Sequence, residues 1–399
     1  MNALQDVTVI DLTRFAAGPF CTVQLADMGA TVIKVESKTS ADEARNFTPF
    51  LGEGDQQMSG YFAQYNRNKK GITLNLRSEE GKSLLKKMLA KADILVENYR
   101  PGIMKKMGLD YKTLHQLFPK LVYVSISGYG QYGPYVTRPA FDNCAQALSG
   151  IWSTTGYPDR PPCRVGTIIG DLSASLYGCI GALAALHHAR NTGEGQWVDV
   201  AQLDSTLSLT ETMVTNYMVE GKITKPLGND HPFVMPYSAF KAKDGYIFDG
   251  GYTDKFWRLQ CEFFGEPEFA DIPEIDTMVK RNVRSTYEKL VKPKLEEWIS
   301  RYTVDELMEG LGDKIPIAPI KDVSQVVKDP QVLARDMIVE TEYPQGKVGT
   351  VGQPIKFSET PANTSGLAPS VGEHNVEIYL DWLGLSQETF DEYNQRGII

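Results

Sequence analysis

The chain has 399 residues, of which 42% are hydrophobic and 23% charged, and its 41 basic and 50 acidic side chains give a net charge of −9. This balance is typical of a globular protein with two or three domains, and it excludes wholesale disorder. An acidic chain without a basic tail is a poor candidate for nucleic-acid binding, because that binding depends on neutralising phosphates.

Strands and helices alternate through the first half of the chain. Val7–Asp11 predicts a buried strand, Phe20–Met28 an amphipathic helix and Thr31–Glu36 a second strand, which together form a βαβ unit. The alternation continues with strands at Ile72–Leu76, Asp93–Val96, Leu121–Ser127 and Gln196–Val200, and with helices at Ser78–Lys91, Tyr111–Phe118 and Asp171–Arg190. The first half therefore predicts an α/β fold with an open, doubly wound parallel sheet.

The second half of the chain has a different character. The turn Ala242–Gly245 predicts a hairpin between strands at Tyr237–Lys241 and Tyr246–Gly250. Helices are predicted at Leu203–Glu220, Asp254–Phe264, Lys280–Leu311 and Val376–Leu385, and a strand at Pro316–Val323. We assign residues 1–205 and 325–399 to a large domain, 206–227 to a linker helix and connection, and 228–324 to a small α+β domain.

The five cysteines lie far apart and form no C-x-x-C pair, so neither a disulfide framework nor a zinc site is expected. Reduced thiols favour a cytoplasmic protein. The first eighteen residues do not resemble a signal peptide. The longest apolar stretch, around Cys179–Leu186, is shorter than the ~20 residues that span a bilayer. We therefore expect a soluble protein with no membrane partner.

Several common catalytic arrangements are missing. The turn Arg14–Pro19 holds one glycine where a dinucleotide-binding G-x-G-x-x-G motif needs three, so nicotinamide and flavin chemistry is not expected. The histidines are scattered, without an H-E-x-x-H grouping, so no metal ligands are predicted. The G-x-S-x-G motif of serine hydrolases is also absent.

Gly170 and Asp171 open a predicted helix that is rich in small residues. Asp171 can simply cap this helix, as aspartates commonly do. The same position also favours an ionised carboxylate, because a helix N-terminus carries partial positive charge, and Gly170 adds no side chain to obstruct a substrate. An ionised, approachable carboxylate can act as a nucleophile. The pattern alone leaves both interpretations open.

Basic residues follow predicted strands or end loops, where they can bind phosphates at the carboxyl edge of a parallel sheet. Each of them singly is equally well explained as a solvated surface side chain. These residues are Arg67, Lys69, Lys70, Arg100, Lys105 and Lys106. The loop Ser127–Tyr135 is rich in glycine and aromatic residues, as loops that border ligands often are.

Several short segments, in their order and spacing, resemble the class III CoA-transferases, a family that includes formyl-CoA and carnitine CoA-transferases. The resemblance runs from about Val7 to the C-terminus. It rests on AAGP at 16–19, GATVIKVE at 29–36, NRNKK at 66–70, ENYRPG at 97–102, SGYGQYGP at 127–134, GD at 170–171, GEGQ at 193–196, DPQVLAR at 329–335 and GEH at 372–374. It implies a large Rossmann-like domain, a smaller domain and an interlocked homodimer.

The resemblance also implies the chemistry. Asp171 would attack the thioester of an acyl-CoA donor to give an aspartyl–acyl anhydride, and then carry CoA as an aspartyl-CoA thioester to a free carboxylic acid. Coenzyme A and acyl-CoA are thus substrates, with no permanently bound cofactor. The implied CoA contacts are Arg14, Ala16, Ala17, Lys69, Lys70, Asn98, Tyr99, Arg100 and Lys106.

Two alternatives remain beside a CoA-transferase. An α-methylacyl-CoA racemase shares the fold, but racemases pair the aspartate with a histidine where this chain has Phe141, which cannot transfer a proton. The other alternative is a catalytically inactive acyl-CoA-binding protein.

The acyl group is left open among small aliphatic, carnitine-like, dicarboxylic and aryl acids. Only Gly250–Gly251 stands where formyl-CoA transferase has a run of glycines, which disfavours oxalate and formyl specificity. Three aromatic residues of the small domain, Tyr237, Phe248 and Tyr252, can line an acyl pocket or form a satellite core.

Overall fold

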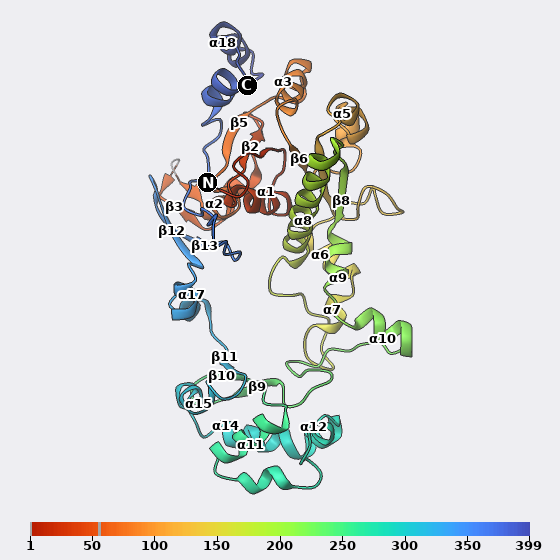
Figure 1. Cartoon of the computed structure of the whole chain (residues 1–399), viewed down its shortest axis with the longest axis vertical. Coiled ribbons are helices and arrows are strands. Elements are labelled where there is room, and N and C mark those ends of the chain that lie inside the picture. The colour runs from red at the N-terminus through yellow and green to blue at the C-terminus, as the bar shows by residue number, and fades with distance from the viewer. Residues whose placement is uncertain (1, 55–56) are drawn as a thin grey trace. The chain divides into compact units, whose positions relative to one another are not determined.

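The computed structural model describes residues 2–54 and 57–399 (Figure 1). The chain divides into two compact units. The large unit comprises Met1–Ile151, Arg164–Thr215 and Pro330–Ile399, and the small unit comprises Trp152–Cys163 and Asn216–Asp329. The large unit is therefore built from both ends of the chain and the small unit mostly from its middle.

A six-stranded parallel sheet forms the centre of the large unit. Its strands are β1 (Thr8–Asp11), β2 (Thr31–Glu36), β5 (Lys70–Thr73), β6 (Ile94–Glu97), β7 (Val122–Ser127) and β8 (Trp197–Ala201). Their order across the sheet is β5-β2-β1-β6-β7-β8, and every neighbouring pair is parallel. The predicted α/β class with a large parallel sheet is confirmed. The strand order reverses between β1 and β6, and such a reversal opens a ligand crevice at the carboxyl ends of the strands.

Apolar side chains cover both faces of this sheet, because successive strand residues point to opposite faces. One layer packs against α3 (Glu79–Leu89), α5 (Tyr111–Leu117) and the C-terminal segment that holds η5 (Glu377–Trp382) and α18 (Gln387–Gln395). The opposite layer packs against α1 (Ala17–Asp27) and α8 (Ile169–Thr192). The predicted amphipathic character of the first helix is wrong, since ten residues of α1 are buried between its neighbours.

Helix α8 has 24 residues and is long and apolar enough to cross a membrane by length and composition, which corrects the shorter apolar stretch expected from the sequence. Half of its apolar window is buried, and it packs against α1, β7 and β8 as a core helix does. Its small residues allow this close approach. A Cβ atom added to Gly178 would lie 2.9 Å from Ile126 Cδ1, and one added to Gly181 would lie 2.6 Å from Val198 Cγ1.

The helix predicted at Leu203–Glu220 is in fact two helices, α9 (Gln202–Ser208) and α10 (Met213–Glu220). Between them Thr210 Oγ1 donates to Leu207 O at 2.7 Å, and Glu211 has a φ angle of +50°. Side-chain bonds to the local backbone compete with helix formation, and a positive φ ends it.

Other short elements complete the large unit. A hairpin of β12 (Ile338–Tyr343) and β13 (Gly346–Val351) and the helix α18 were not predicted. The remaining elements are η1 (Glu43–Asn46), β3 (Phe50–Leu51), β4 (Met58–Ser59), α2 (Gly60–Asn66), α4 (Ile103–Lys106), α6 (Asp142–Leu148) and α17 (Pro330–Ala334), with α7 (Ile151–Thr154) at the boundary between the units.

The small unit contains an antiparallel sheet of β9 (Ser238–Lys241), β10 (Tyr246–Asp249) and β11 (Ile317–Pro319), so the predicted hairpin is confirmed. Its core is built around Trp257, Tyr287 and Trp298. The predicted helix Lys280–Leu311 is wrong as one element, because the segment is divided into several. The helical segments of the whole small unit are α11 (Asp254–Phe263), η3 (Pro267–Asp271), α12 (Met278–Arg281), α13 (Arg284–Thr286), η4 (Tyr287–Val291), α14 (Lys292–Ile299), α15 (Val304–Leu311) and α16 (Val323–Val326).

Candidate active site

Asp171 lies in the first turn of α8, but it does not cap the helix. The N-cap residue is Ile168, which makes no side-chain cap bond. Asp142 of α6 does the capping instead, and its Oδ1 accepts the backbone N–H of Gly170 at 2.8 Å and of Asp171 at 3.3 Å. The capping interpretation of Asp171 is therefore wrong, and its carboxylate is left for other contacts.

Gly170 makes room for this arrangement. A Cβ atom at position 170 would lie 3.0 Å from Asp142 Oδ1 and 3.2 Å from Thr206 Oγ1. The glycine thus admits the capping carboxylate, whereas the sequence suggested that it clears a path for substrate. Gln146 holds Asp142 from the other side, with Nε2 donating to Asp142 Oδ2 at 2.6 Å and to Thr167 O at 3.1 Å.

The Asp171 carboxylate is partly exposed and poorly solvated. Burial, with a contribution from the neighbouring Asp142 charge, raises its pKa to about 7. Burial thus outweighs the helix N-terminus, which alone would favour the ionised form. Gln202 Nε2 donates a hydrogen bond to Asp171 Oδ1. Protonated and ionised forms coexist near neutral pH, and the ionised form is a basic carboxylate able to attack an activated acyl carbon.

Aromatic side chains of α2 and the preceding loops border the nucleophile. Burial raises the pKa of Tyr61 and Tyr65, and the charge of Asp171 adds to both shifts. The two rings lie 5.0 Å apart, and Phe47 lies 5.3 Å from Tyr61. Sequence analysis missed this aromatic wall, because no local pattern joins α2 to a helix that begins a hundred residues later.

The turn after β1 lies against the first turn of α8. The Ser175 hydroxyl is within hydrogen-bond distance of Ala17 O and of Asp171 O, the latter at 2.7 Å. Ala16 and Ala17 are both buried, so any contact that they make with a ligand is through backbone. The structure thus brings the predicted turn residues and Asp171 together.

Three predicted CoA contacts meet where the strand order reverses. Asn98 Oδ1 accepts the Arg14 N–H at 3.0 Å and Asn98 Nδ2 donates to Arg14 O at 2.8 Å, so this side chain holds the turn in place. Arg14 and Tyr99 line a pocket of about 520 Å³. Its other lining residues are Val35, Glu36, Ser37, Thr39, Ser40, Asp42, Leu74, Asn75, Leu76, Arg77, Ile103 and Met107.

Lys69 and Lys70 do not reach this pocket. The buried ammonium of Lys69 contacts Asp11 Oδ2 at 3.0 Å and Asn66 Oδ1 at 2.9 Å, and burial lowers its pKa to about 8. Lys70 pairs with Glu377. The CoA contacts predicted for these lysines remain predictions, and their internal partners argue against them.

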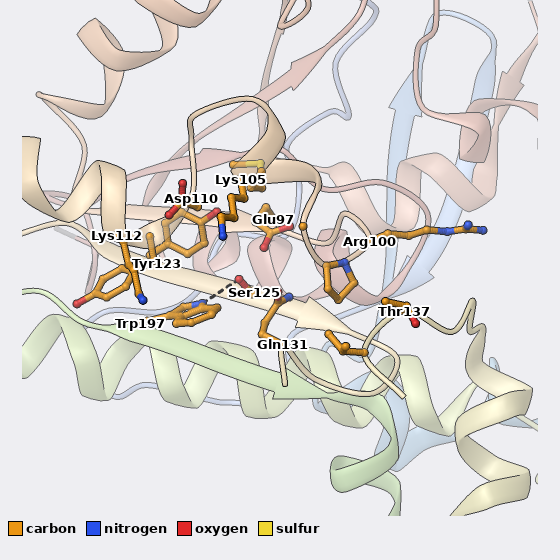
Figure 2. Close-up of a pocket in the computed structure, with 15 residues that line it drawn as sticks. Glu97, Arg100, Lys105, Asp110, Lys112, Tyr123, Ser125, Gln131, Thr137 and Trp197 are labelled. Atoms are coloured by element: carbon orange, nitrogen blue, oxygen red, sulfur yellow. Dashed lines mark hydrogen bonds between the residues drawn. The ribbon is translucent and has the colours of Figure 1, made fainter. Parts of the chain in front are cut away.

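Arg100 borders a second pocket, of about 490 Å³ (Figure 2). In Figure 2 its side chain extends away from Glu97, whose buried carboxyl has a pKa raised to about 7 by burial. Trp197 Nε1 donates to Ser125 Oγ at 3.0 Å across the same pocket. Met104 and Lys105 line this pocket while Ile103 and Met107 line the first, so α4 separates the two. Lys106 is exposed and lines neither.

The small-unit aromatics form a cluster of their own. The ring of Tyr237 lies 4.7 Å from that of Phe248 and 6.4 Å from that of Tyr252. Gly250 N donates to Pro316 O at 2.8 Å, which connects the loop after β10 to the residue that precedes β11. A role of these rings in an acyl pocket remains a prediction.

The sequence matches the model of CoA-transferase family III over residues 4–375. The chain belongs to CoA-transferase family III. It is 36% identical to the succinyl-CoA:mesaconate CoA-transferase of Haloarcula marismortui over 98% of both chains, and 34% identical to the human succinyl-CoA:glutarate CoA-transferase over 100% of this chain and 90% of that one. A CaiB/BaiF family crystal structure from Brucella suis matches with a TM-score of 0.84 and 34% identity, over 96% of this chain and 100% of that one.

These similarities confirm the predicted family and enzyme class. The transferase moves CoA from an acyl-CoA donor to a free carboxylic acid. The racemase alternative also lacks its proton carrier in the structure, because the residue at that place is Phe141, an exposed side chain at the N-cap of α6. Sequence analysis also missed Asp142 and Gln202 as partners of Asp171, and it did not single out Arg77, which lines the 520 Å³ pocket.

Proposed function

We propose that Asp171 is the nucleophile of this CoA-transferase. The observation that carries the proposal is a partly exposed carboxylate that has no cationic partner among the described residues, while a second carboxylate, Asp142, satisfies the helix N-terminus. A carboxylate engaged by an arginine or by backbone N–H groups would be a weaker nucleophile, since those partners stabilise its charge. Here one oxygen, Oδ2, is left for attack because Oδ1 accepts from Gln202.

In the first step Oδ2 of Asp171 attacks the carbonyl carbon of the donor thioester. The carbon–sulfur bond breaks, which leaves an aspartyl–acyl anhydride and the CoA thiolate. The thiolate then attacks Cγ of Asp171, and the Cγ–Oδ2 bond breaks as the donor acid leaves as a carboxylate. The acceptor carboxylate attacks the resulting aspartyl-CoA thioester, and the same steps run in reverse to give the acceptor's CoA ester.

The CoA moiety is proposed to bind the 520 Å³ pocket at the strand-order reversal. Arg14 already pairs with Glu43 at 2.8 Å. Arg77 lines the pocket without an ion pair to any described residue, which makes it the better partner for a CoA phosphate. Tyr99 offers a ring for the adenine base. The buried turn at Ala16–Ala17 then leads from this pocket towards Asp171.

The substrates are proposed to be succinyl-CoA and a dicarboxylic acid of five carbons. This choice rests on the names of similar enzymes, which act on succinyl-CoA with mesaconate, D-citramalate or glutarate. Succinyl-, acetyl- and butyryl-CoA are each offered to a mixture of mono- and dicarboxylic acids, and the new CoA esters are weighed by mass spectrometry. Preferred transfer to a monocarboxylic acid would contradict the assignment.

A cytoplasmic homodimer with interlocked chains is also proposed, with the large and small units acting as the predicted domains. All five cysteines are free, as in a reducing compartment. Leu176 and Ile180 of α8 are 47% and 61% exposed, as expected for a helix face that a second copy covers. Light scattering on the eluted protein gives the mass, and a monomer would contradict the proposal.

Hydroxylamine tests the nucleophile. It attacks aspartyl anhydrides and thioesters but leaves free carboxylates intact. We expect the enzyme to be inactivated by hydroxylamine only when a donor acyl-CoA is present, with Asp171 converted to the hydroxamate. Equal inactivation with and without donor would contradict a covalent intermediate at this residue.

A further inference from the structure

Gln202 is the first residue of α9, and its side chain reaches the nucleophile. Its Nε2 donates to Oδ1 of Asp171, and the residue is 8% exposed. Its backbone is held on both sides of this contact, because Thr206 Oγ1 donates to Gln202 O at 2.7 Å and the next residue, Leu203, donates its N–H to Gly128 O at 3.1 Å. The amide is thus placed on Oδ1 before any substrate binds.

The other end of the same amide has no partner. Gln202 Oε1 is buried and accepts no hydrogen bond from any residue that the structure describes. Gln146, by contrast, bridges two groups, because its Nε2 donates to Asp142 and its Oε1 accepts from Val165 N at 3.3 Å. A buried acceptor without a partner is costly.

Gln260 of the small unit shows the same pattern at Asp249, with Nε2 on its Oδ1 and Oε1 without a described partner. The difference lies in the carboxyl that each amide contacts, because Asp171 is partly exposed and Asp249 is buried. The amide of Gln202 therefore makes a single bond, and that bond is to a carboxyl that a substrate can approach.

The reaction changes the charge on Oδ1 in a defined order. This argument rests on the proposed role of Asp171. When Oδ2 attacks the donor thioester, the oxyanion forms on the donor carbonyl, and Oδ1 becomes the neutral carbonyl oxygen of the anhydride. When the CoA thiolate then attacks Cγ, the electron pair of the Cγ–Oδ1 double bond moves onto Oδ1. Collapse returns that pair and breaks the Cγ–Oδ2 bond. Attack by the acceptor carboxylate on the thioester charges Oδ1 again.

We propose that Gln202 is a catalytic residue, whose Nε2–H stabilises the oxyanion that forms on Oδ1 of Asp171 each time its Cγ atom is attacked. The donor is fixed in advance, so it needs no reorganisation when the charge develops, and it lies in a buried site where such a bond is strong. Its contribution falls on the steps at the aspartyl carbon. The first attack on the donor thioester has its oxyanion elsewhere and does not use this bond.

The test is Gln202→Met, which keeps the size of the side chain and removes the N–H donor. Loss of one such donor typically lowers kcat by about 10²-fold. The anhydride still forms but then persists longer before the thiolate attacks Cγ, so water hydrolyses more of it at the donor acyl carbon, where the oxyanion does not form on Oδ1. We expect slower transfer of CoA to the acceptor acid together with a higher ratio of donor hydrolysis to transfer, and little change in KM for the donor.

Ser208→Ala is the matched control, because Ser208 lies on the same helix and its hydroxyl contacts Tyr177 OH and Ser205 O but not Asp171. It should keep the wild-type rate and hydrolysis ratio. If Gln202→Met does not fold, Gln202→Asn is used, which withdraws the same amide by one methylene. An unchanged rate, or a loss with an unchanged hydrolysis ratio, would overturn the proposal, because a merely misplaced Asp171 slows both outcomes equally. A wild-type enzyme that is not inactivated by hydroxylamine with donor would instead refute Asp171 as nucleophile.

Discussion

Two aspartates of this chain share an unusual environment and differ in one respect. Burial raises the pKa of Asp249 in the small unit to about 7, as it does for Asp171 in the large unit. Each Oδ1 accepts a hydrogen bond from a glutamine Nε2, from Gln202 at Asp171 and from Gln260 at Asp249, the latter at 2.5 Å. The raised pKa and the glutamine partner do not distinguish the two carboxyls.

Access separates them. Asp249 is 1% exposed, and its Oδ1 also accepts the N–H of Gly251 at 2.8 Å, so it holds the loop after β10. Asp171 is partly exposed at the start of α8, and no residue within 2–54 or 57–399 forms a hydrogen bond with its Oδ2. A raised pKa thus reports burial in both places. A carboxyl can act as a nucleophile only where a substrate can also approach it.

The largest effect is expected from neutralising the two carboxyls in turn. Asp171→Asn removes the attacking oxygen, and transfer should fall by at least ~10³-fold, since loss of a nucleophile leaves only binding and the remaining stabilisation. Asp249→Asn keeps an oxygen acceptor for Gly251 and should leave transfer within a few-fold of wild type. Steady-state assays measure the transfer rate of both variants. Comparable losses would contradict the claim that substrate access distinguishes Asp171 from Asp249.

The next effect concerns binding. Arg77→Ala should raise KM for the acyl-CoA donor by about 10-fold with little change in kcat, since a charge-assisted bond to phosphate contributes ~1.5–3 kcal/mol. Arg77→Lys keeps the charge and should recover part of the loss. Dephospho-CoA esters offered to each variant then show which phosphate is contacted. A fall in kcat at unchanged KM would contradict the assignment of this pocket.

A smaller effect is expected on the pH profile. The attacking form is the carboxylate, so transfer should rise with pH through about 7, the pKa to which Asp171 is raised. Asp142→Asn removes the neighbouring charge while keeping an oxygen for the helix N-terminus. The rise of its transfer rate with pH should therefore occur at lower pH than in wild type, so that the rate at pH 6, relative to the maximum, increases several-fold. An unchanged pH profile would show that the charge of Asp142 does not affect the pKa of Asp171.

The smallest effect on transfer is expected at Asp249, where the change appears in stability instead. Its folded-state pKa, about 7, lies above the ordinary aspartate value of 3.8, so the folded state keeps a proton that the unfolded state loses between these values, and it loses stability as the pH rises through them. Asp249→Asn has no charge to bury. The gain in its free energy of unfolding over wild type should grow by about 2–3 kcal/mol from pH 5 to pH 8, as measured by denaturant unfolding. A gain that does not vary with pH would contradict the raised pKa.

The sequence could predict those elements that depend on a local pattern of apolar residues. The apolar runs at Val7–Asp11, Thr31–Glu36 and Leu121–Ser127 became parallel strands of one sheet, and Asp171 was singled out by its place beside a glycine at a helix start. The break between α9 and α10 was missed, because it depends on the backbone conformation of Glu211 and not on a change in hydropathy.

The partners of Asp171 could not be predicted in the same way. Asp142 and Gln202 lie 29 and 31 residues away along the chain, and only the packing of α6, α8 and α9 brings them together. Lys69 shows the reverse error. It follows a helix and precedes a strand as a phosphate-binding lysine does, yet its ammonium turns inward to Asp11. Charge alone does not tell which way a side chain points.

Mass spectrometry of the enzyme after incubation with donor acyl-CoA alone tests the central claim most directly. Without an acceptor acid, the aspartyl-CoA thioester should accumulate, and the peptide that contains Asp171 should carry one CoA while the peptide that contains Asp249 carries none. Addition of the acceptor acid should discharge the adduct at the rate of turnover. Full transfer activity with an unmodified Asp171 peptide at every time point would contradict the account.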